Sequence, residues 1–405
     1  MATTATAPTG DAPAGRRHLK HRLGPLATLA VLTASVFIIG TAEYVMTGLV
    51  PALSADFDRP VSTTGSLVGW YALTVTLAGP LVTIALLRLP PRRVLLGMLA
   101  AFTAGSAAAA LATGFDTLLA ARVLTALTHS TTFAVAMVAA ISSAPAGQRG
   151  RVVAVVASGW NLASVLGAPL GTWIGDRFGW RTTFWGIAAF ALLVFVAAAT
   201  LVRPRSAAPP TPRTEVAALL RPRVGLVLAA TVLVQAGLFT AYTYISPLLQ
   251  GPGGFSSAGV SVLLAVFGVG ALLGNGLGGR LADRAPASAL CVAIVVLASV
   301  LALTAGAIHA QLAAVGAVFA LGTASAVLVP LLQERALDAG PGAPTLVTAV
   351  SASAFNLGIA GGSWLGGRAL DTGLGLPDLA WLGGAVALVA LAPALAAARL
   401  DRTAE

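Results

Sequence analysis

Three ionisable residues lie inside long apolar stretches, and their types suit proton chemistry. Glu43 lies in "GTAEYVMTGLVP" and Arg122 in "LLAARVLTALTHS", with His129 two helical turns after Arg122. Residues at that spacing face nearly the same side of a helix. Ionisable side chains at membrane depth are costly and are usually functional. We interpret Glu43, Arg122 and His129 as a candidate proton-coupling site.

The positions of Glu43 and Arg122 along their apolar stretches allow the two side chains to meet. Each lies roughly 8–9 Å inside the same predicted membrane boundary, at about 1.5 Å per residue. The pair is either a switchable proton site or a permanent ionic link between two helices. His129 lies about 10 Å deeper on the Arg122 face. It is either a neutral histidine bonded to a backbone carbonyl or part of a proton relay.

The composition requires a surface that faces lipid. Of 405 residues, 57% are hydrophobic and only 9% are charged, whereas soluble domains carry roughly a quarter charged residues. The formal charge of +10 comes from arginines in short connections between apolar runs, so no nucleic-acid partner is expected. Cys291 is the one cysteine, which excludes an internal disulfide. No Walker-type "GK[ST]" loop, "HExxH" or paired Cys/His cluster is present, so we expect no cofactor, no metal and no enzymatic activity.

Apolar runs of about 20 residues recur along the chain, as membrane-spanning helices require. The sequence predicts twelve spans, at about 25–49, 63–87, 94–114, 117–142, 152–174, 182–202, 224–248, 257–279, 287–307, 310–332, 344–366 and 378–398. Most arginines fall at the termini, in the even-numbered connections and in the Pro- and Arg-rich linker between the sixth and seventh spans. By the positive-inside rule, both termini and this linker are cytoplasmic, and the protein lies in the cell inner (plasma) membrane.

One half of the chain echoes the other. The segment Ala157–Gly171 ("ASGWNLASVLGAPLG") returns as Ala352–Gly366 ("ASAFNLGIAGGSWLG"), and Asn161 matches Asn356. Repeats in the same order are typical of transporters with two parallel bundles. We therefore predict an all-α membrane protein whose twelve transmembrane helices form two pseudo-symmetric six-helix bundles. The predicted division is an N-terminal tail 1–24, a first bundle 25–202, a linker 203–223, a second bundle 224–398 and a C-terminal tail 399–405.

Other residues are candidates for the substrate cavity or for helix packing. Asn161 and Asn356 either face a central cavity or bond to a neighbouring helix. Tyr44 and Tyr242 suit flat amphipathic substrates, although aromatic residues also gather at membrane interfaces. The small-residue stripe of the fifth span contains Gly167, Pro169 and Gly171, which allow close backbone approach and a bend.

Several of these motifs resemble those of the major facilitator superfamily, over about residues 25–398. In that family a loop motif of the form GxLaDrxGRR follows the second span, with a degenerate copy after the eighth. Here "GRLADR" provides the second copy, and "IALLRLPPRR" provides a first copy that departs from the pattern. The residues concerned are Gly279, Asp283 and Arg284 in the second copy, and Arg88, Arg92 and Arg93 in the first. Arg88 stands where the family has Asp.

The narrower resemblance is to the twelve-span drug:proton antiporter branch, and to chloramphenicol-resistance and sugar-efflux exporters that carry "GTxEF/Y" in the first span. It implies that Glu43 is the acidic position, that Arg122 is the arginine linked to proton transfer, and that the Gly167–Gly171 region and "GWRTTFW" match the antiporter motif and its sequel. The expected function is proton-coupled efflux of an amphipathic drug or secondary metabolite by alternating access. Export of a sugar or nucleoside, and an uncoupled channel or sensor, are the alternatives. The expected partners are a small-molecule substrate, protons and the lipid bilayer, with the protein acting as a monomer.

Overall fold

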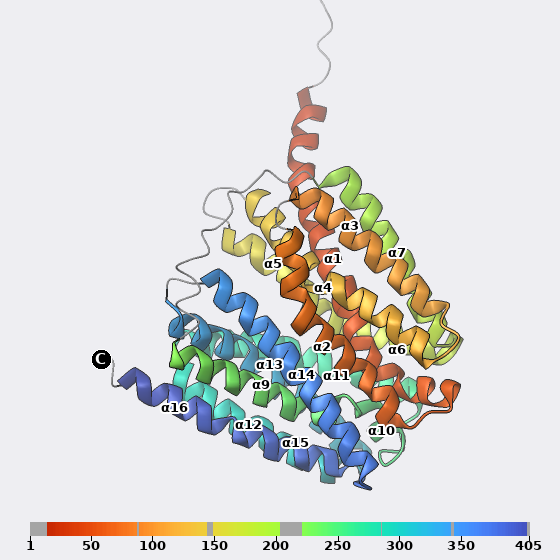
Figure 1. The fold of residues 1–405 in the computed structure, drawn as a ribbon, viewed down its shortest axis with the longest axis vertical. Helices are drawn as coiled ribbons and strands as arrows, with labels where there is room; N and C mark the ends of the chain where they lie inside the picture. Colours follow the sequence, from red (N-terminus) through yellow and green to blue (C-terminus); the bar gives the residue numbers. More distant parts are fainter. Residues whose placement is uncertain are drawn as a thin grey trace, which may run out of the picture.

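The computed structural model describes residues 14–86, 89–143, 149–202, 221–284, 286–341 and 344–402. Within these ranges the chain is helical throughout, without β-strands (Figure 1). The elements are α1 (Ala14–Phe57), α2 (Val61–Leu86), α3 (Pro91–Ala110), α4 (Phe115–Ser143), α5 (Arg149–Leu162), the π-helical turn η1 (Ala163–Gly167), α6 (Ala168–Phe178), α7 (Trp180–Leu201), α9 (Pro222–Tyr242), α10 (Ile245–Gln250), α11 (Ser257–Ala282), α12 (Pro286–Ala307), α13 (Gln311–Ala339), α14 (Pro344–Asp371), α15 (Asp378–Val389) and α16 (Leu391–Arg402).

Proline, glycine and one serine set the helix ends. Prolines occupy the first turn of α3 and α9, where the missing N–H would have no intrahelical partner. Gly179 separates α6 from α7 with φ of 88°, a conformation that glycine adopts without steric cost. The Ser256 hydroxyl accepts a 3.1 Å hydrogen bond from the Gly259 amide and caps α11. Short connections of this kind bring consecutive helices back across the molecule as antiparallel neighbours.

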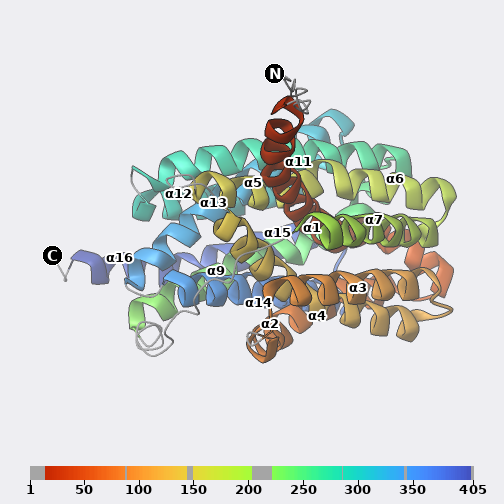
Figure 2. The same ribbon diagram turned by 90° about the horizontal axis from the view of Figure 1, so that it is seen from above.

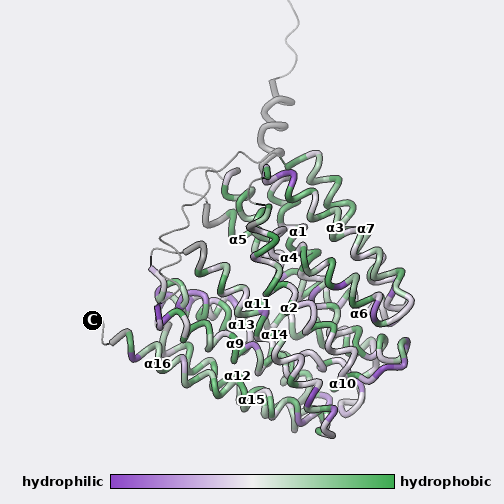
Figure 3. The backbone as a smooth tube through the Cα atoms, in the orientation of Figure 1, coloured by the Kyte–Doolittle hydropathy of each residue, from purple (hydrophilic) through white to green (hydrophobic). Residues whose placement is uncertain are grey.

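Eleven helical segments of the described chain are long and apolar enough to cross a membrane. The predicted span 344–366 falls on α14, which is 28 residues long but does not reach that apolarity. Its glycines, serines and one asparagine lower its mean hydropathy. Such residues suit a helix that packs mainly against two other helices, here α2 and α9. Figure 3 shows hydrophobic residues along most helices and hydrophilic ones mainly toward their ends. Large outward side chains such as Leu77 and Leu303, 62% and 69% exposed, agree with a lipid-facing surface.

The helix packing of the first half recurs in the second. In the first half α1 packs against α5 and α7, and α4 packs against α2 and α3. In the second half α9 packs against α14 and α15, and α13 packs against α11 and α12. Each pair in the second half contains the helices that the sequence echo matches to the pair in the first half. The repeat in the sequence is therefore also a repeat of helix neighbours.

Small residues lie at matching helix–helix crossings in the two halves. A Cβ added at Gly167 would overlap the Thr41 hydroxyl on α1, and one added at Gly362 would overlap the Ala236 carbonyl on α9. Gly362 follows Gly167, and Ala236 follows Thr41, by the same separation that relates Asn356 to Asn161. Close backbone approach at small residues is how helices associate in a membrane, where the hydrophobic effect between them is absent.

The two halves meet along two seams on opposite flanks of the molecule, α2 with α14 and α11 with η1 and α6 (Figures 1 and 2). In the α2–α14 seam, Ser363 Oγ donates to the Gly65 carbonyl at 3.0 Å and Tyr244 Oη donates to the Ser363 carbonyl at 3.1 Å. Nearer the middle of the helices, Thr76 Oγ1 donates to the Ser353 carbonyl at 3.3 Å. The Ser363 and Thr76 bonds join the two halves along α2 and α14, whereas the Tyr244 bond lies within the second half.

Candidate functional site

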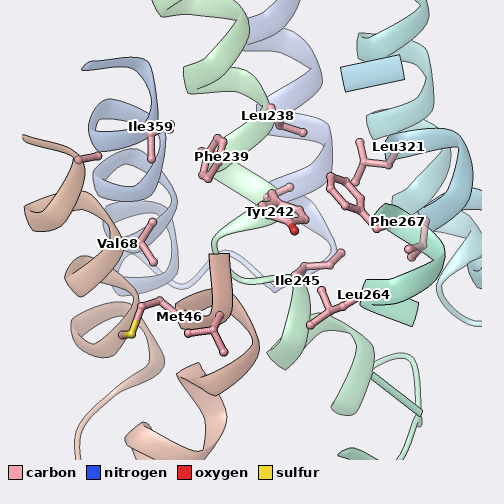
Figure 4. Packing of buried hydrophobic residues seen from close by; sticks show 14 of the residues in the cluster. Met46, Val68, Leu238, Phe239, Tyr242, Ile245, Leu264, Phe267, Leu321 and Ile359 are labelled. Carbon is pink, nitrogen blue, oxygen red and sulfur yellow. The ribbon is translucent and has the colours of Figure 1, made fainter. Parts of the chain in front are cut away.

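A small cavity of about 10 Å³, room for roughly one water molecule, lies between the halves. It is lined by Glu43, Tyr44, Thr47, Val68, Tyr71, Arg122, Phe239 and Ile359, which come from α1, α2 and α4 on one side and from α9 and α14 on the other. Figure 4 shows Met46 and Val68 of the first half in one packed cluster with Phe239, Tyr242 and Ile359 of the second. The cavity is thus lined mostly by apolar and aromatic side chains, with two charged ones.

The Glu43 carboxylate contacts His129. Oε2 lies 3.8 Å from Nδ1 of His129, and the two side chains are 12% and 7% exposed. The Tyr71 hydroxyl lies 3.0 Å from the same nitrogen. The His129 ring also packs against Trp160 of α5, with centroids 5.1 Å apart. Four helices therefore hold one acid, one imidazole and one phenol together away from bulk water.

Arg122 is fixed by neutral partners. Its side chain is 1% exposed, and Nη1 donates a 2.7 Å hydrogen bond to the Ala42 carbonyl, beside Glu43 in the chain. Its guanidinium carbon lies 4.2 Å from the centre of the Tyr71 ring, a cation–π distance. Its Nε lacks a hydrogen-bond partner among the described residues. A buried donor without a partner is costly, and this one belongs to a side chain that lines the cavity.

The predicted proton-coupling residues lie close together, but in a different arrangement from the expected one. Among the described residues the ion-pair partner of Glu43 is His129, and Arg122 forms no ion pair. The sequence estimate placed His129 about 10 Å deeper than Arg122. That estimate compared backbone heights alone, whereas the glutamate and histidine side chains extend toward each other. Tyr71 and Trp160, which complete the cluster, were not predicted, because a sequence does not show which face of α2 or α5 turns inward.

The four predicted substrate-cavity residues occupy different places. Tyr44 lines the cavity. Tyr242 is buried and stacks on Phe267 at 4.5 Å. Asn356 is buried, with Nδ2 donating to Ala352 at 3.1 Å and Oδ1 without a described partner. Asn161 is half-buried. Their contact with a substrate stays a prediction.

A π-helical turn interrupts the fifth span just before Pro169. Pro169 follows η1, where the Ala168 amide bonds to the Ala163 carbonyl five residues back. Proline has no N–H and its ring excludes the carbonyl four residues earlier, so the turn widens. Gly171 lies against Val45 of α1, as Gly167 lies against Thr41. The stripe thus packs one face of η1 and α6 onto α1, while α11 covers another face.

The predicted loop motifs lie at the ends of α2, α3 and α11. Arg88 falls outside the described residues. The Arg92 side chain donates to the Ala199 carbonyl of α7, and Arg93 is exposed. The second copy ends α11: Gly279 is half-buried, and Asp283 and Arg284 are exposed just beyond the helix. A gating role for these residues stays a prediction.

A second polar cluster, not predicted from the sequence, lies at the α1–α2 end of the molecule. Arg181 pairs with Asp56 at 2.9 Å and also donates to the Ala112 carbonyl at 3.1 Å. Trp180 Nε1 donates to the same carboxylate at 3.1 Å. The cluster ties the ends of α1 and α3 to the start of α7. Both charged side chains are about two-fifths exposed, so the pair contributes little stability.

The sequence assigns this fold, which holds two charged side chains in a buried cavity between its two halves, to a known family. The sequence model of the Major Facilitator Superfamily matches residues 32–363, and the chain belongs to this family. As a family member it is a multi-pass membrane transporter and not an enzyme. Within the described residues, no group of three His, Cys, Asp or Glu side chains could hold a metal ion.

Curated relatives cover nearly the whole chain. A chloramphenicol resistance protein of Streptomyces lividans is 36% identical over 373 residues, which are 90% of this chain and 94% of that protein. A probable sugar efflux transporter of Mannheimia succiniciproducens is 32% identical, covering 89% and 91%. The inner membrane transport protein YdhP of Escherichia coli K12 is 34% identical, covering 91% and 94%.

Solved structures share the fold at low sequence identity. A bacterial homologue of the human lysosomal transporter Spinster, in an inward-facing and occupied conformation, matches with a TM-score of 0.74 and 16% identity, covering 96% of this chain and 98% of the other. A D-xylose–proton symporter matches with a TM-score of 0.70 and 16% identity, covering 90% and 96%. These likenesses establish the fold alone.

Proposed function

We propose that this protein is a proton-coupled antiporter that exports a small amphipathic compound, such as a chloramphenicol-like drug or a secondary metabolite, by alternating access. The observation that carries the proposal is Glu43, a carboxylate inside the cavity between the two halves. A buried carboxylate that can be reached from one side at a time is suited to carry a proton across. The name of the Streptomyces lividans relative supports drug efflux.

The cavity wall favours a neutral or weakly charged substrate. Tyr44, Tyr71 and Phe239 offer aromatic faces, and Thr47 offers a hydroxyl. Arg122 is engaged by the Ala42 carbonyl and the Tyr71 ring, whereas Glu43 faces His129 at 3.8 Å, beyond hydrogen-bond distance. The chemistry of this wall matches a flat amphipathic molecule with a hydrogen-bond donor.

Topology completes the proposal. We assign α14 as the twelfth span, residues 25–202 and 224–398 as the two bundles, and both termini to the cytoplasm of the cell that carries the protein in its plasma membrane. The α1–α2 loop then faces outward, and the α2–α14 seam closes the outer side. The structure would accordingly be an inward-facing state. The charged ends of α3 and α11 lie on the cytoplasmic side, and the protein acts as a monomer.

A second candidate is export of a sugar or nucleoside. The hydroxyls around the small cavity favour it, because Tyr44 can bond to a polyhydroxylated substrate and the oxygens of Thr47 and Tyr71 can still accept. The name of the Mannheimia relative agrees with this candidate. The two candidates differ in how much the aromatic side chains contribute to binding.

Purified protein in proteoliposomes with an imposed pH gradient tests the function. Radiolabelled chloramphenicol and a neutral hexose serve as probes of the two candidates. Accumulation of a probe against its gradient, abolished by a protonophore, is the expected result, with chloramphenicol preferred over the hexose. Flux that follows only the probe's own gradient would show an uncoupled channel and would overturn the proposal.

A further inference from the structure

One nitrogen of His129 faces two oxygens of different hydrogen-bonding character. The Tyr71 hydroxyl lies 3.0 Å and Oε2 of Glu43 lies 3.8 Å from Nδ1. In neutral imidazole one nitrogen donates and the other accepts, whereas in imidazolium both donate. A tyrosine hydroxyl can donate to an Nδ1 that carries no proton, and a carboxylate can accept from an Nδ1 that carries one. The Tyr71 hydroxyl can donate or accept, whereas an ionised carboxylate only accepts, so the two contacts are compatible with different protonation states of the same atom.

We infer that Tyr71 is a positioning residue for proton transfer, which holds neutral His129 with its proton on Nε2 so that Nδ1 is the atom that exchanges a proton with Glu43. This inference rests on the proposed proton coupling. In the forward step a proton leaves the protonated Glu43 carboxyl for Nδ1, and the products are a carboxylate beside an imidazolium. In the reverse step Nδ1 returns the proton, and the Tyr71 hydroxyl donates to Nδ1 again.

Tyr71 is held firmly enough to position its neighbour. It is 1% exposed, and its ring lies beneath the Arg122 guanidinium at 4.2 Å. Arg122 is itself anchored to the Ala42 carbonyl of α1. On its other side the His129 ring packs against Trp160. The imidazole is thus fixed between two rings, with Nδ1 toward the acid.

The distances connect this exchange with helix movement. The 3.0 Å Tyr71 contact is a formed hydrogen bond, whereas 3.8 Å to Glu43 exceeds the usual 2.7–3.2 Å. A small approach of α1 to α4 would close that gap. Tyr71 also lies on α2, whose Gly65 and Gly69 contact Ser363 of the second half. The partner of Nδ1 would then differ between the two conformations of the transporter.

The titratable and charged side chains around His129 come from three helices. They are Glu43 and Tyr44 of α1, Tyr71 of α2 and Arg122 of α4, while α5 contributes the uncharged Trp160 ring. Of these, Glu43 and Tyr71 contact Nδ1. A change in the pH profile on removing the Tyr71 hydroxyl would therefore act through His129 and Glu43.

Nitrogen-15 NMR of histidine reads the tautomer directly. His18, His21 and His309 are replaced by Gln so that His129 is the one labelled histidine, and the protein is studied in lipid nanodiscs near neutral pH. The expected spectrum has an unprotonated Nδ1 and a protonated Nε2. If neutral His129 carries its proton on Nδ1, the inference is wrong. No residue of the cluster is substituted in this measurement.

Tyr71→Phe supplies the second arm, because it keeps the ring beneath Arg122 and removes only the hydroxyl. We expect the Nδ1 resonance to move toward the protonated form, and coupled transport to fall about tenfold with a shifted pH profile while substrate exchange persists. Tyr44→Phe, which removes a cavity hydroxyl that does not bond to His129 in the structure, should leave the tautomer unchanged. An unchanged tautomer in Tyr71→Phe, or equal losses of exchange and coupled transport, would contradict the positioning role.

The outcomes separate this inference from the proposed function. If Glu43→Gln still accumulates substrate from a pH gradient, the coupling proposal fails whatever the tautomer of His129. If Glu43→Gln loses accumulation but Tyr71→Phe leaves both the tautomer and the pH profile intact, only the role of Tyr71 fails.

Discussion

At the scale of single residues, one buried acid is held beside a histidine and an arginine without a direct bond to the arginine. Arg122 bonds to the backbone beside Glu43 and to the Tyr71 ring, so its charge acts on the carboxylate through space. This arrangement leaves the Glu43 oxygens free for a proton, for His129 or for a substrate. A tight carboxylate–guanidinium pair would instead favour permanent ionisation.

Glu43→Gln keeps the shape of the side chain and removes the exchangeable proton. We expect this variant to lose accumulation driven by a pH gradient, where one pH unit per proton is worth about 1.4 kcal/mol, or about tenfold accumulation. Exchange of substrate across the membrane at equal pH should persist. Parallel measurements of gradient-driven uptake and counterflow in proteoliposomes check this, and undiminished gradient-driven uptake would remove Glu43 from the mechanism.

Arg122→Lys keeps the positive charge but loses the planar fork of the guanidinium. An ammonium cannot donate to the Ala42 carbonyl and also lie flat over the Tyr71 ring. We expect coupled transport to fall by about tenfold, or roughly 1.4 kcal/mol in activation free energy. The initial transport rate per folded protein, measured against wild type, gives the answer. A wild-type rate would show that charge alone is sufficient at this position.

At the scale of elements, small residues let α1 approach η1 and α6 closely. The Gly167 position has no room for a Cβ because the Thr41 side chain fills it. Gly186 on α7 is exposed, with no atom near its Cβ position. The two glycines therefore form a matched pair, one in a helix crossing and one on an open helix face.

Gly167→Ala should lower stability by about 1–3 kcal/mol through overpacking. Gly186→Ala should leave stability unchanged or raise it slightly, since alanine favours helix over glycine. Apparent melting temperatures in the same detergent compare the two variants. Equal melting temperatures would show that α1 and η1 separate easily and that the crossing contributes little.

The sequence predicted the spans better than their interruptions. Long apolar runs located the helices, and the echo of Asn161 in Asn356 matched a repeat of helix neighbours. The break between α9 and α10, where Tyr244 inserts toward Gly65, was placed inside one continuous span. It depends on contacts with the other half that no local pattern records. Tyr71 escaped prediction for the same reason, because its role comes from His129 on another helix.

At the scale of the whole molecule, the halves must separate along the α2–α14 seam for the outer side to open. Tyr244 fills that seam: its ring lies against Gly65 and its hydroxyl bonds to Ser363. A Cβ built on Gly367 would lie 3.9 Å from the Ser62 Cβ, within the range that a disulfide spans. Replacement of Cys291 by Ser provides a background without native cysteine. A disulfide between positions 62 and 367 would therefore hold the seam shut.

The most direct test of movement between the halves is transport by Ser62→Cys/Gly367→Cys in the Cys291→Ser background, before and after oxidation. Each single-cysteine variant serves as a control for any effect of the substitution on folding or on Tyr244. We predict that oxidation abolishes transport in the double variant alone and that reductant restores it. Full transport by protein that is shown to be cross-linked would contradict a mechanism in which the two halves open alternately around Glu43.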